Sequence, residues 1–362
     1  MKPINCISLF SNIGISEAYL HYADIDIKVA NEVDAQRASL YSKLYPKTNM
    51  ICGNILNEST YQELLNSARH HKVEMILATP PCQGMSIANT YRKKRESSNY
   101  LNDLIKPVVS LIKDLNPLNI LIENVRGMEN TYIYDDVGDP VLILDYLARS
   151  IPAEYLINYR VLDSADYGTP QHRKRLIVLI SRCGAWEHPE PRTDSKITVY
   201  EAIGQMLSLE PGQHSNLPWH YGSHLNEDHI RWMKHTPTGH TAFNNKEHYP
   251  AVKTTGASKR PIIGFQSAYK RISWDKPCPT IHTQNGLISS YNNVHPGRVK
   301  PDGTYSDART LSVREILILC GLPANWLDHH QYLNEAFIRK ALGECFPPKF
   351  CLEMMKALPR PN

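Results

Sequence analysis

The segment ATPPCQGMS, from Ala78 to Ser86, follows a short apolar run that begins at Met75. The run has the length of a buried strand, and the two prolines end it because proline lacks the N–H that a sheet needs. A strand that ends in this way presents Cys82 in a stiff loop at the carboxyl edge of a sheet, where open α/β folds bind ligands. A lone cysteine is more often a buried, inert thiol. The function of Cys82 therefore depends on the partners that the rest of the chain supplies.

Short apolar runs alternate with helix-patterned segments on both sides of this segment. Strands are expected at Asn5–Phe10, Ile27–Val33, Met50–Ile55, Glu74–Thr79, Asn119–Glu123, Leu156–Leu162 and Arg175–Ile180. Helices are expected at Ser16–Tyr22, Ala35–Leu44, Tyr61–His70 and Tyr100–Leu115. This alternation predicts βαβ units and a mostly parallel, Rossmann-like α/β sheet with helices on both faces.

Length and composition indicate a globular protein of two domains, or of one large domain that carries an insertion. Its 362 residues are 42% apolar and 21% charged, and no apolar stretch reaches the roughly 20 residues of a membrane span. The N-terminus lacks the long apolar segment of a signal peptide, so a cytoplasmic protein is expected. Eight cysteines without paired CxxC spacing argue against a metal cage or a disulfide framework. We therefore expect no metal and no membrane contact.

Two features suggest a site for an adenosine-bearing cofactor. The first strand leads into a turn at Gly14 and a helix start, as in Rossmann-like sheets. Glu32 ends the second strand, where an acid accepts hydrogen bonds from ribose hydroxyls. A plain turn between strand and helix fits Gly14 about equally well, because the GxGxxG pattern is absent.

Three later groups of polar residues are candidates for catalysis and substrate binding. Glu123 ends a buried strand, where a carboxyl group can protonate or hydrogen-bond a ring nitrogen, although capping of a loop is the simpler role. Gln171, Arg173 and Arg175 alternate, so an extended segment would place them on one face. The basic run Arg92–Arg95 follows the Cys82 loop, and it suits either a phosphate backbone or a solvated surface.

The ordered motifs TPPCQ, ENV and QxRxR resemble those of the DNA cytosine-5 methyltransferases, here of the prokaryotic restriction-modification kind. The resemblance continues through Arg314-Glu315 and the GECFPP segment, and it covers nearly the whole chain. It implies an S-adenosylmethionine-dependent catalytic domain formed by residues 1–184 and 334–362. It also implies a smaller, irregular target-recognition domain at 185–333, a region rich in Pro, Gly, His, Asn and Thr.

The resemblance also implies a mechanism. Cys82 as thiolate would add to C6 of cytosine while Glu123 protonates or hydrogen-bonds N3, so that C5 attacks the methyl sulfonium of S-adenosylmethionine. Arg173 and Arg175 would hold the base and its adduct. Because C6 is hidden within a duplex, the cytosine would be flipped out at a cost of a few kcal/mol.

The family's binding residues are carried over position by position. Cofactor contacts are expected from Phe10, Asn12, Gly14, Glu32, Val33, Asn54, Ile55, Pro81 and Gly343. DNA contacts are expected from Gln83, Ser86 and Gln171 in or near the motifs, and, because of their charge, from the basic residues Arg92, Lys93, Lys94, Arg95, Lys259, Arg260, Lys270 and Arg271. The sequence departs from the family's FxGxGG turn at Asn12 and Ile15, and from its last motif at Glu344. Asn12 tolerates a positive φ and is expected to preserve the turn.

Double-stranded DNA is the expected partner, with no obligate protein partner. Between His248 and Pro301 the chain has eight Lys and Arg residues and one acid, although the net charge is only +4. Such a basic region indicates a polyanion. Two alternatives remain: a tRNA cytosine-5 methyltransferase that uses the same motifs, and a non-catalytic nucleic-acid-binding relative whose cofactor site has decayed.

Overall fold

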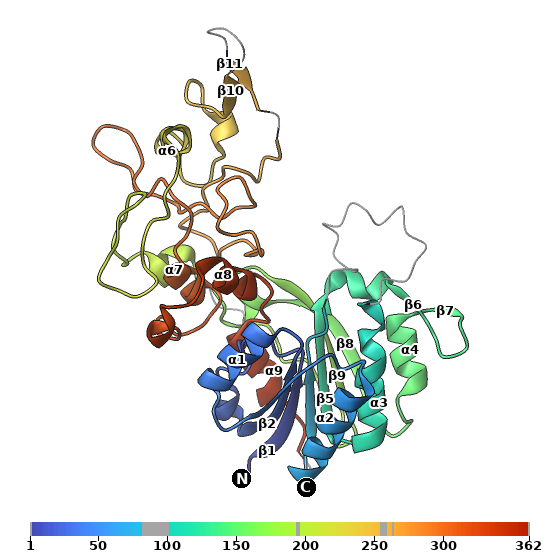
Figure 1. The fold of residues 1–362 in the computed structure, drawn as a ribbon. Helices are drawn as coiled ribbons and strands as arrows, with labels where there is room; N and C mark the ends of the chain where they lie inside the picture. The colour runs from blue at the N-terminus through green and yellow to red at the C-terminus, as the bar shows by residue number, and fades with distance from the viewer. Residues whose placement is uncertain (1, 82–100, 193–195, 254–258, 263, 361–362) are drawn as a thin grey trace. The chain divides into compact units, whose positions relative to one another are not determined.

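The computed structural model describes residues 2–81, 101–192, 196–253, 259–262 and 264–360. Its main feature is a seven-stranded sheet in the order β3-β2-β1-β4-β5-β9-β8 (Figure 1). The first five strands in this order run parallel, and β9 alone among the seven runs in the opposite direction, antiparallel to both of its neighbours, β5 and β8. The strands are β1 Ile4–Leu9, β2 Ile25–Glu32, β3 Asn49–Cys52, β4 Met75–Ala78, β5 Asn119–Val125, β8 Leu156–Asp163 and β9 Lys174–Ser181. The expected mostly parallel α/β sheet is confirmed.

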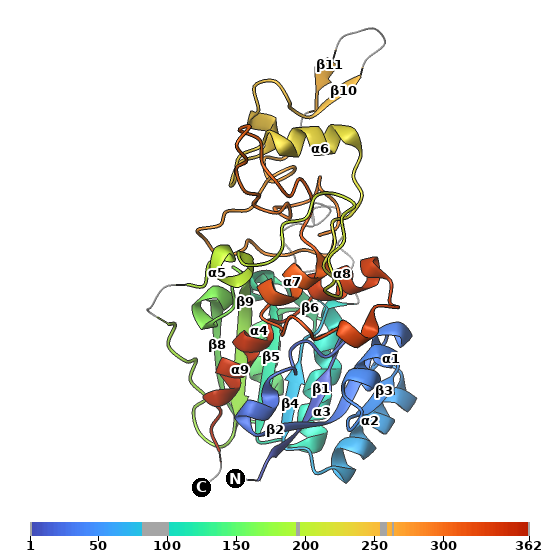
Figure 2. The same cartoon turned by 90° about the vertical axis from the view of Figure 1, so that its left-hand side faces the viewer.

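Helices cover both faces of this sheet, as Figures 1 and 2 show. One face packs against α2 Glu58–His70, α3 Ile105–Leu115 and α4 Ile143–Ser150 in a continuous apolar core. The two other helices of this part of the chain are α1 Ala35–Leu44 and α9 Pro348–Lys356. A short antiparallel hairpin, β6 Tyr132–Tyr134 and β7 Pro140–Leu142, lies between β5 and α4 in the chain.

The expected helix at Ser16–Tyr22 is wrong. This segment forms turns and then a short 3₁₀ helix, Leu20–Ala23. The hydroxyl groups of Ser8 and Ser16 both donate to the buried Glu17 carboxylate, at 2.5 and 2.8 Å. Side-chain hydrogen bonds of this kind compete with the first turn of a helix. In the described ranges no helix is both long enough and apolar enough to cross a membrane.

The chain divides into two compact units. The first contains residues 1–163, 174–191 and 348–362, and the second contains residues 164–173 and 192–347. The second unit holds α5 Val199–Ile203, α6 Glu227–Lys234, α7 Val313–Leu319, α8 Glu335–Gly343, β10 Ala251–Lys253 and β11 Lys259–Pro261. It contains most of the predicted recognition domain, 185–333, and also residues 334–347, so the functional boundaries stay a prediction.

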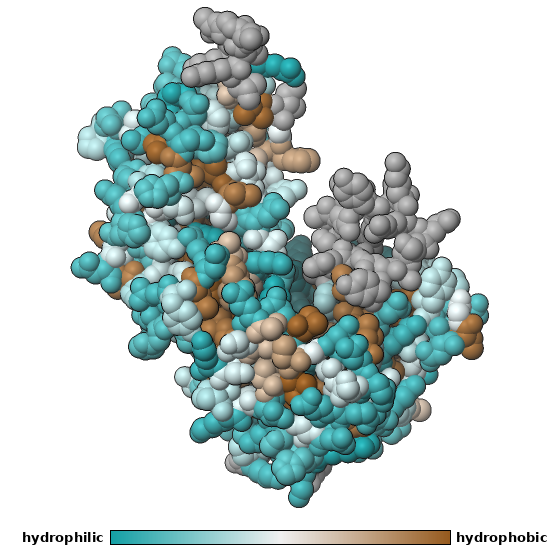
Figure 3. All heavy atoms as spheres, in the orientation of Figure 1, coloured by the Kyte–Doolittle hydropathy of each residue, from teal (hydrophilic) through white to brown (hydrophobic). Residues whose placement is uncertain are grey.

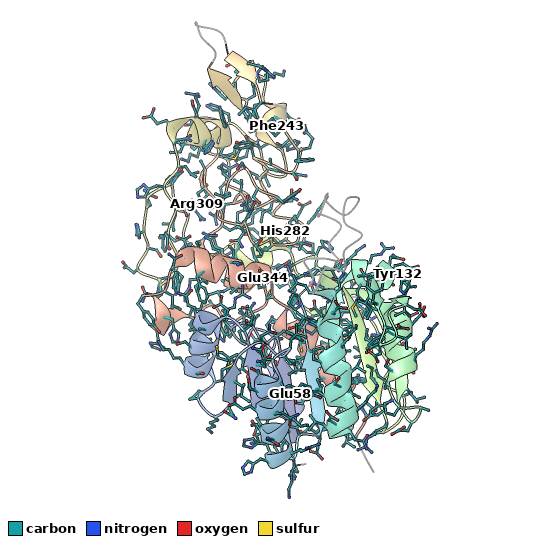
Figure 4. The ribbon with its side chains drawn as sticks, turned by 45° about the vertical axis from the view of Figure 1, so that its right-hand side comes forward. Glu58, Tyr132, Phe243, His282, Arg309 and Glu344 are labelled. Atoms are coloured by element: carbon teal, nitrogen blue, oxygen red, sulfur yellow. The ribbon has the colours of Figure 1, made fainter. Side chains whose placement is uncertain are left out.

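Buried charges organise the interior of the second unit. Arg309, labelled in Figure 4, pairs with Asp307 at 2.8 Å and with Glu315 at 2.8 Å, and all three side chains are fully buried. The pKa of Glu315 is lowered to about 2 because Arg309 outweighs the effect of burial. His295 lies beside both acids, yet burial lowers its pKa to about 3. The ring is therefore neutral near pH 7.

Candidate active site

The carboxyl edge of the first unit's sheet gathers most of the predicted cofactor residues. Phe10 follows β1, Glu32 ends β2, Asn54 follows β3 and Pro81 follows β4. Because these strands are parallel neighbours, their carboxyl ends meet at one edge. Glu123 lies near the same end of β5.

The loop after β1 has a left-handed backbone at every second residue. The φ angles are 59° at Phe10, 52° at Asn12 and 81° at Gly14. Asn12 thus adopts the conformation for which glycine is usual, as predicted. A side chain at Gly14 would place its Cβ 2.2 Å from the Tyr45 ring, whose hydroxyl donates to the Gly14 carbonyl at 2.5 Å. Ile15 is buried, so its bulk does not occupy the exposed side of the loop.

Glu32 holds this loop through its carboxylate. The backbone amide of Asn12 donates to Oε2 and that of Asp34 donates to Oε1, each at 2.9 Å. Burial raises the pKa of the Glu32 carboxyl, and the two amide bonds oppose that shift. Each oxygen has a further lone pair, so the carboxylate can still accept hydrogen bonds from a diol.

The neighbouring strand ends complete a polar edge. The Asn54 amide oxygen accepts the Leu56 N–H at 3.0 Å and keeps a second lone pair. Val33 is 64% exposed, whereas Ile55 is buried. The expected polar side chains of the first unit thus lie at one edge of the sheet. Of the two expected apolar residues, Val33 is exposed there, whereas Ile55 belongs to the core.

Two residues that the sequence analysis did not single out tie the strand ends together. The Thr79 hydroxyl donates to the Phe10 carbonyl at 3.1 Å, and the Asn124 amide donates to the Pro80 carbonyl at 3.1 Å. These bonds connect the loops that follow β1 and β4 to each other and to the end of β5. Thr79 belongs to the TPPCQ motif and Asn124 to the ENV motif, so these motifs could have identified both residues from the sequence. Tyr45, whose hydroxyl holds the Gly14 carbonyl, lies in none of these motifs.

Glu123 and Arg175 form an ion pair at this edge. Arg175 Nε lies 2.8 Å from Glu123 Oε1, and the two side chains are only 12% and 9% exposed. In the antiparallel register Glu123 faces Ile177, which places Arg175 diagonally across on the same face. Arg175 also donates to the Lys174 carbonyl at 2.8 Å. A carboxyl group that is oriented by a guanidinium at a strand end suits recognition of a heterocyclic base.

Arg173 and Gln171 have a different environment from Arg175. Arg173 is buried in the second unit, where it donates to the carbonyls of Ile281 and Gly343, each at 2.9 Å. Gln171 is also buried, and its amide oxygen accepts the Ile281 N–H at 3.1 Å. The two therefore hold Ile281 through both its backbone N–H and its C=O, which gives them a supporting role inside the second unit. The contact of Arg173 with the base and that of Gln171 with DNA stay predictions.

The predicted DNA-contacting residues divide into three groups. Cys82, Gln83, Ser86 and the run Arg92, Lys93, Lys94 and Arg95 lie outside the described residues. Arg260 is exposed in β11, which begins at Lys259, and Lys270 is half-buried. Arg271 is fully buried and donates to the carbonyls of Met233, His295, Ser306 and Asp307. The expected phosphate contact of Arg271 is therefore wrong, because its guanidinium supports loops from inside.

The last predicted cofactor residue, Gly343, ends α8 in the second unit. A Cβ there would lie 2.5 Å from the backbone of His282 and Thr283, so only glycine permits this close approach. The following Glu344 is exposed, whereas Cys345 and Phe346 are buried. Figure 4 labels Glu344 and His282 in this unit.

The described thiols differ from a catalytic cysteine, which reacts as a thiolate and needs a low pKa. Burial raises the pKa of Cys6, Cys278 and Cys351, which fits inert structural thiols. Among the residues that the structure describes, no cluster of His, Cys, Asp and Glu has the geometry of a metal site.

Comparison with known sequences identifies similar proteins over the whole chain. The family model for C-5 cytosine-specific DNA methylases matches residues 4–360. The chain is 46% identical to the type II methyltransferase M1.HgaI of Avibacterium volantium over 352 residues, which cover 96% of each protein. It is 24% identical to the type II methyltransferase M.XorII of Xanthomonas oryzae over 390 residues, or 99% of this chain and 85% of the relative.

Solved structures share the fold. A prophage-encoded E. coli protein, described as a DNA modification methyltransferase, superimposes with a TM-score of 0.68 at 17% identity, and the match covers 98% of both chains. The Entamoeba histolytica methyltransferase EhMeth gives a TM-score of 0.63 at 15% identity, with 99% of this chain and 98% of that chain covered. At these identities the likeness concerns the fold.

Proposed function

Because this chain belongs to the C-5 cytosine-specific DNA methylases and is an enzyme of the type II restriction-modification kind, we propose that it methylates one specific duplex sequence through a covalent Cys82–C6 adduct. The observation that carries this proposal is the Glu123–Arg175 pair, which ends β5 beside the strand that leads to Pro81 and Cys82. It provides an oriented carboxyl group on the strand next to β4, which Thr79, Pro80 and Pro81 follow in the chain.

The residues of the sheet edge fit S-adenosylmethionine, which supplies an electrophilic methyl group when bound. Glu32 would accept hydrogen bonds from the ribose hydroxyls, and Asn54 would accept one from the adenine amine. The positive φ angles at Phe10, Asn12 and Gly14 would let the cofactor approach the loop backbone closely. The buried position of Ile15 supports the proposal, because this departure from the family pattern leaves the loop's exposed side clear.

The proposed reaction begins on the cytosine ring. The Cys82 thiolate adds to C6, and Glu123 donates a proton or a hydrogen bond to N3, which gives C5 enamine character. C5 then takes up the methyl group, the proton on C5 is lost to a base, and the thiolate leaves from C6. Arg175 orients the Glu123 carboxyl group throughout. The cytosine is flipped out of the duplex, since C6 is otherwise inaccessible.

Transfer of labelled methyl groups tests the proposal against its alternatives. Purified protein is incubated with labelled S-adenosylmethionine and either genomic DNA or tRNA, and bisulfite sequencing then locates the modified cytosines. Label in DNA at one recurring sequence is the expected result. Label in tRNA alone would contradict the DNA assignment. A protein that binds no S-adenosylmethionine would be the non-catalytic relative.

A further inference from the structure

An exposed row of aromatic rings stands on the second unit. Phe265 is 76% exposed, Tyr291 is 44% exposed, and His282 is also exposed. The ring centroids of Phe265 and Tyr291 are 6.5 Å apart with the planes 30° from parallel, and those of His282 and Tyr291 are 5.3 Å apart. We name these three residues the aromatic row. Phe265 is the one phenylalanine among the exposed large apolar side chains of the described residues, on a surface that is mostly hydrophilic in the view of Figure 3.

The backbone beneath the row is fixed from behind. The segment that carries Phe265 is joined to the segment that carries Tyr291 by two bonds, from Tyr269 N to Ile288 O at 3.1 Å and from Asn292 N to Ser267 O at 2.9 Å. Ile288 belongs to a small buried core, and the Tyr269 ring packs against it. The two loops therefore present their rings from a rigid base.

Buried asparagines hold the His282 end of the row. The Asn285 amide donates to the His282 carbonyl at 2.7 Å and to the Arg339 carbonyl at 2.8 Å. The Asn293 amide donates to the carbonyls of Asn285 and Leu287 at 2.9 and 2.6 Å. Such satisfied internal bonds keep the segment between His282 and Asn293 in one conformation. The exposed rings are thus preorganised, which lowers the entropic cost of binding.

Charge around the row selects the kind of partner. The region from His248 to Pro301 contains eight Lys and Arg residues and one acid, Asp275. Arg260 is exposed in β11, and Lys270 lies in the same turn region as Phe265. Arg271 of this region is buried, but exposed rings in a segment that is rich in cations and poor in acids still complement a ligand with anionic phosphates and apolar base edges, namely duplex DNA.

We propose that the aromatic row reads base edges of the recognition sequence, while the surrounding cations contact phosphates. Phe265 and Tyr291 supply apolar contact for groups such as the thymine methyl, and His282 supplies a ring nitrogen for a hydrogen bond. This inference rests on the proposed DNA methylation and assigns its sequence specificity to three residues. Three of the four earlier candidates in this region, Lys259, Arg260 and Lys270, then contribute affinity without sequence preference.

A binding selection tests the inference without relying on methyl transfer. Full-length protein selects from a pool of duplexes with a randomised stretch, and sequencing gives the enrichment of the preferred sequence over its single-base variants. Phe265→Ser and the double change Phe265→Ala with Tyr291→Ala are expected to reduce this ratio about 10-fold, the usual cost of one lost base contact. Tyr332→Ala, at a tyrosine of the same unit that is 64% exposed, is the matched control and should leave the ratio unchanged.

Salt dependence separates base reading from phosphate binding. Affinity measured at several salt concentrations should keep its slope in the Phe265 variants, whereas Arg260→Ala should reduce the slope by about one phosphate contact. An enrichment ratio within twofold of the unaltered protein in both Phe265 variants would overturn the inference, as would selection of no sequence by the unaltered protein. If methyl transfer is absent while these effects appear, the proposed function fails and the aromatic row stands.

Discussion

Replacing Arg175 and Arg173 separately with alanine should affect stability and catalysis in opposite order, although the residues are two apart in one motif. Arg173 is buried and donates to two carbonyls. Hydrogen bonds that involve a charged group contribute about 1.5–3 kcal/mol each, so loss of both in Arg173→Ala should lower the free energy of unfolding by about 3–6 kcal/mol. Arg175 makes one buried bond of this kind, to Glu123, and its bond to the Lys174 carbonyl is exposed to solvent, so Arg175→Ala should cost about 1.5–3 kcal/mol.

The catalytic effects should have the reverse order. Arg175→Ala frees the Glu123 carboxyl group from its fixed orientation, and loss of a positioned acid reduces kcat by about 100-fold. Arg173→Ala should retain most of kcat at temperatures where the protein remains folded, because the Arg173 guanidinium is buried and donates to two backbone carbonyls. Arg175→Lys keeps the charge but not the planar Nε–H, so its kcat should be intermediate.

Urea unfolding and single-turnover methyl transfer to genomic DNA measure the two effects on the same preparations. The assay is run at a temperature where circular dichroism shows each variant to be folded. An Arg175→Ala protein with kcat within twofold of the unaltered enzyme would refute the role assigned to the ion pair. Equal unfolding free energies for Arg173→Ala and the unaltered enzyme would refute the stabilising role assigned to the Arg173 hydrogen bonds with Ile281 and Gly343.

Three further predictions concern the cofactor edge and the buried charges. Gly14→Ala should weaken S-adenosylhomocysteine binding in calorimetry and destabilise the first unit, since φ is 81° and a Cβ would meet Tyr45 at 2.2 Å; Asn12→Gly is the tolerated control. Glu32→Ala should weaken cofactor binding about 10-fold or more while DNA affinity persists, because one diol contact and the hold on the Asn12 amide are both lost. Burial lowers the pKa of His295 to about 3 in the folded protein, whereas the same side chain has its ordinary pKa of about 6.5 in the unfolded chain. As the pH drops below about 6.5 the unfolded chain therefore takes up a proton that the folded protein does not, and the free energy of unfolding falls by about 2 kcal/mol at pH 5. Urea unfolding of the unaltered protein and His295→Gln at pH 7 and 5 checks this, and equal pH dependence in both would contradict it.

Much of the first unit was predictable because its pattern is local. The apolar runs gave seven strands whose ends shift by only a few residues in the structure, and the expected helix at Ala35–Leu44 has the same bounds as α1. The motif order also placed Glu32 and Glu123 at strand ends of one edge, which the topology confirms. Hydrophobic period and strand direction suffice for such predictions.

The second unit resisted prediction because its architecture depends on long-range polar contacts. Arg271 stands in a basic, surface-like sequence, yet its guanidinium is buried against four carbonyls. The alternation of Gln171, Arg173 and Arg175 suggested one shared target. Only Gln171 and Arg173 share a target, the backbone of Ile281, which lies more than a hundred residues away in the chain. No local period encodes such contacts.

Covalent trapping tests the central claim most directly. In a long duplex with 5-fluorocytosine at every cytosine, the fluorine blocks loss of the C5 substituent, so a thiolate that has added to C6 cannot leave. With S-adenosylmethionine present, the unaltered enzyme should form a complex that survives denaturing electrophoresis, and peptide mass spectrometry should place the adduct on Cys82. Cys82→Ser should bind the duplex without forming the complex. A covalent complex with Cys82→Ser, or its absence from an unaltered enzyme that methylates ordinary DNA, would contradict the mechanism.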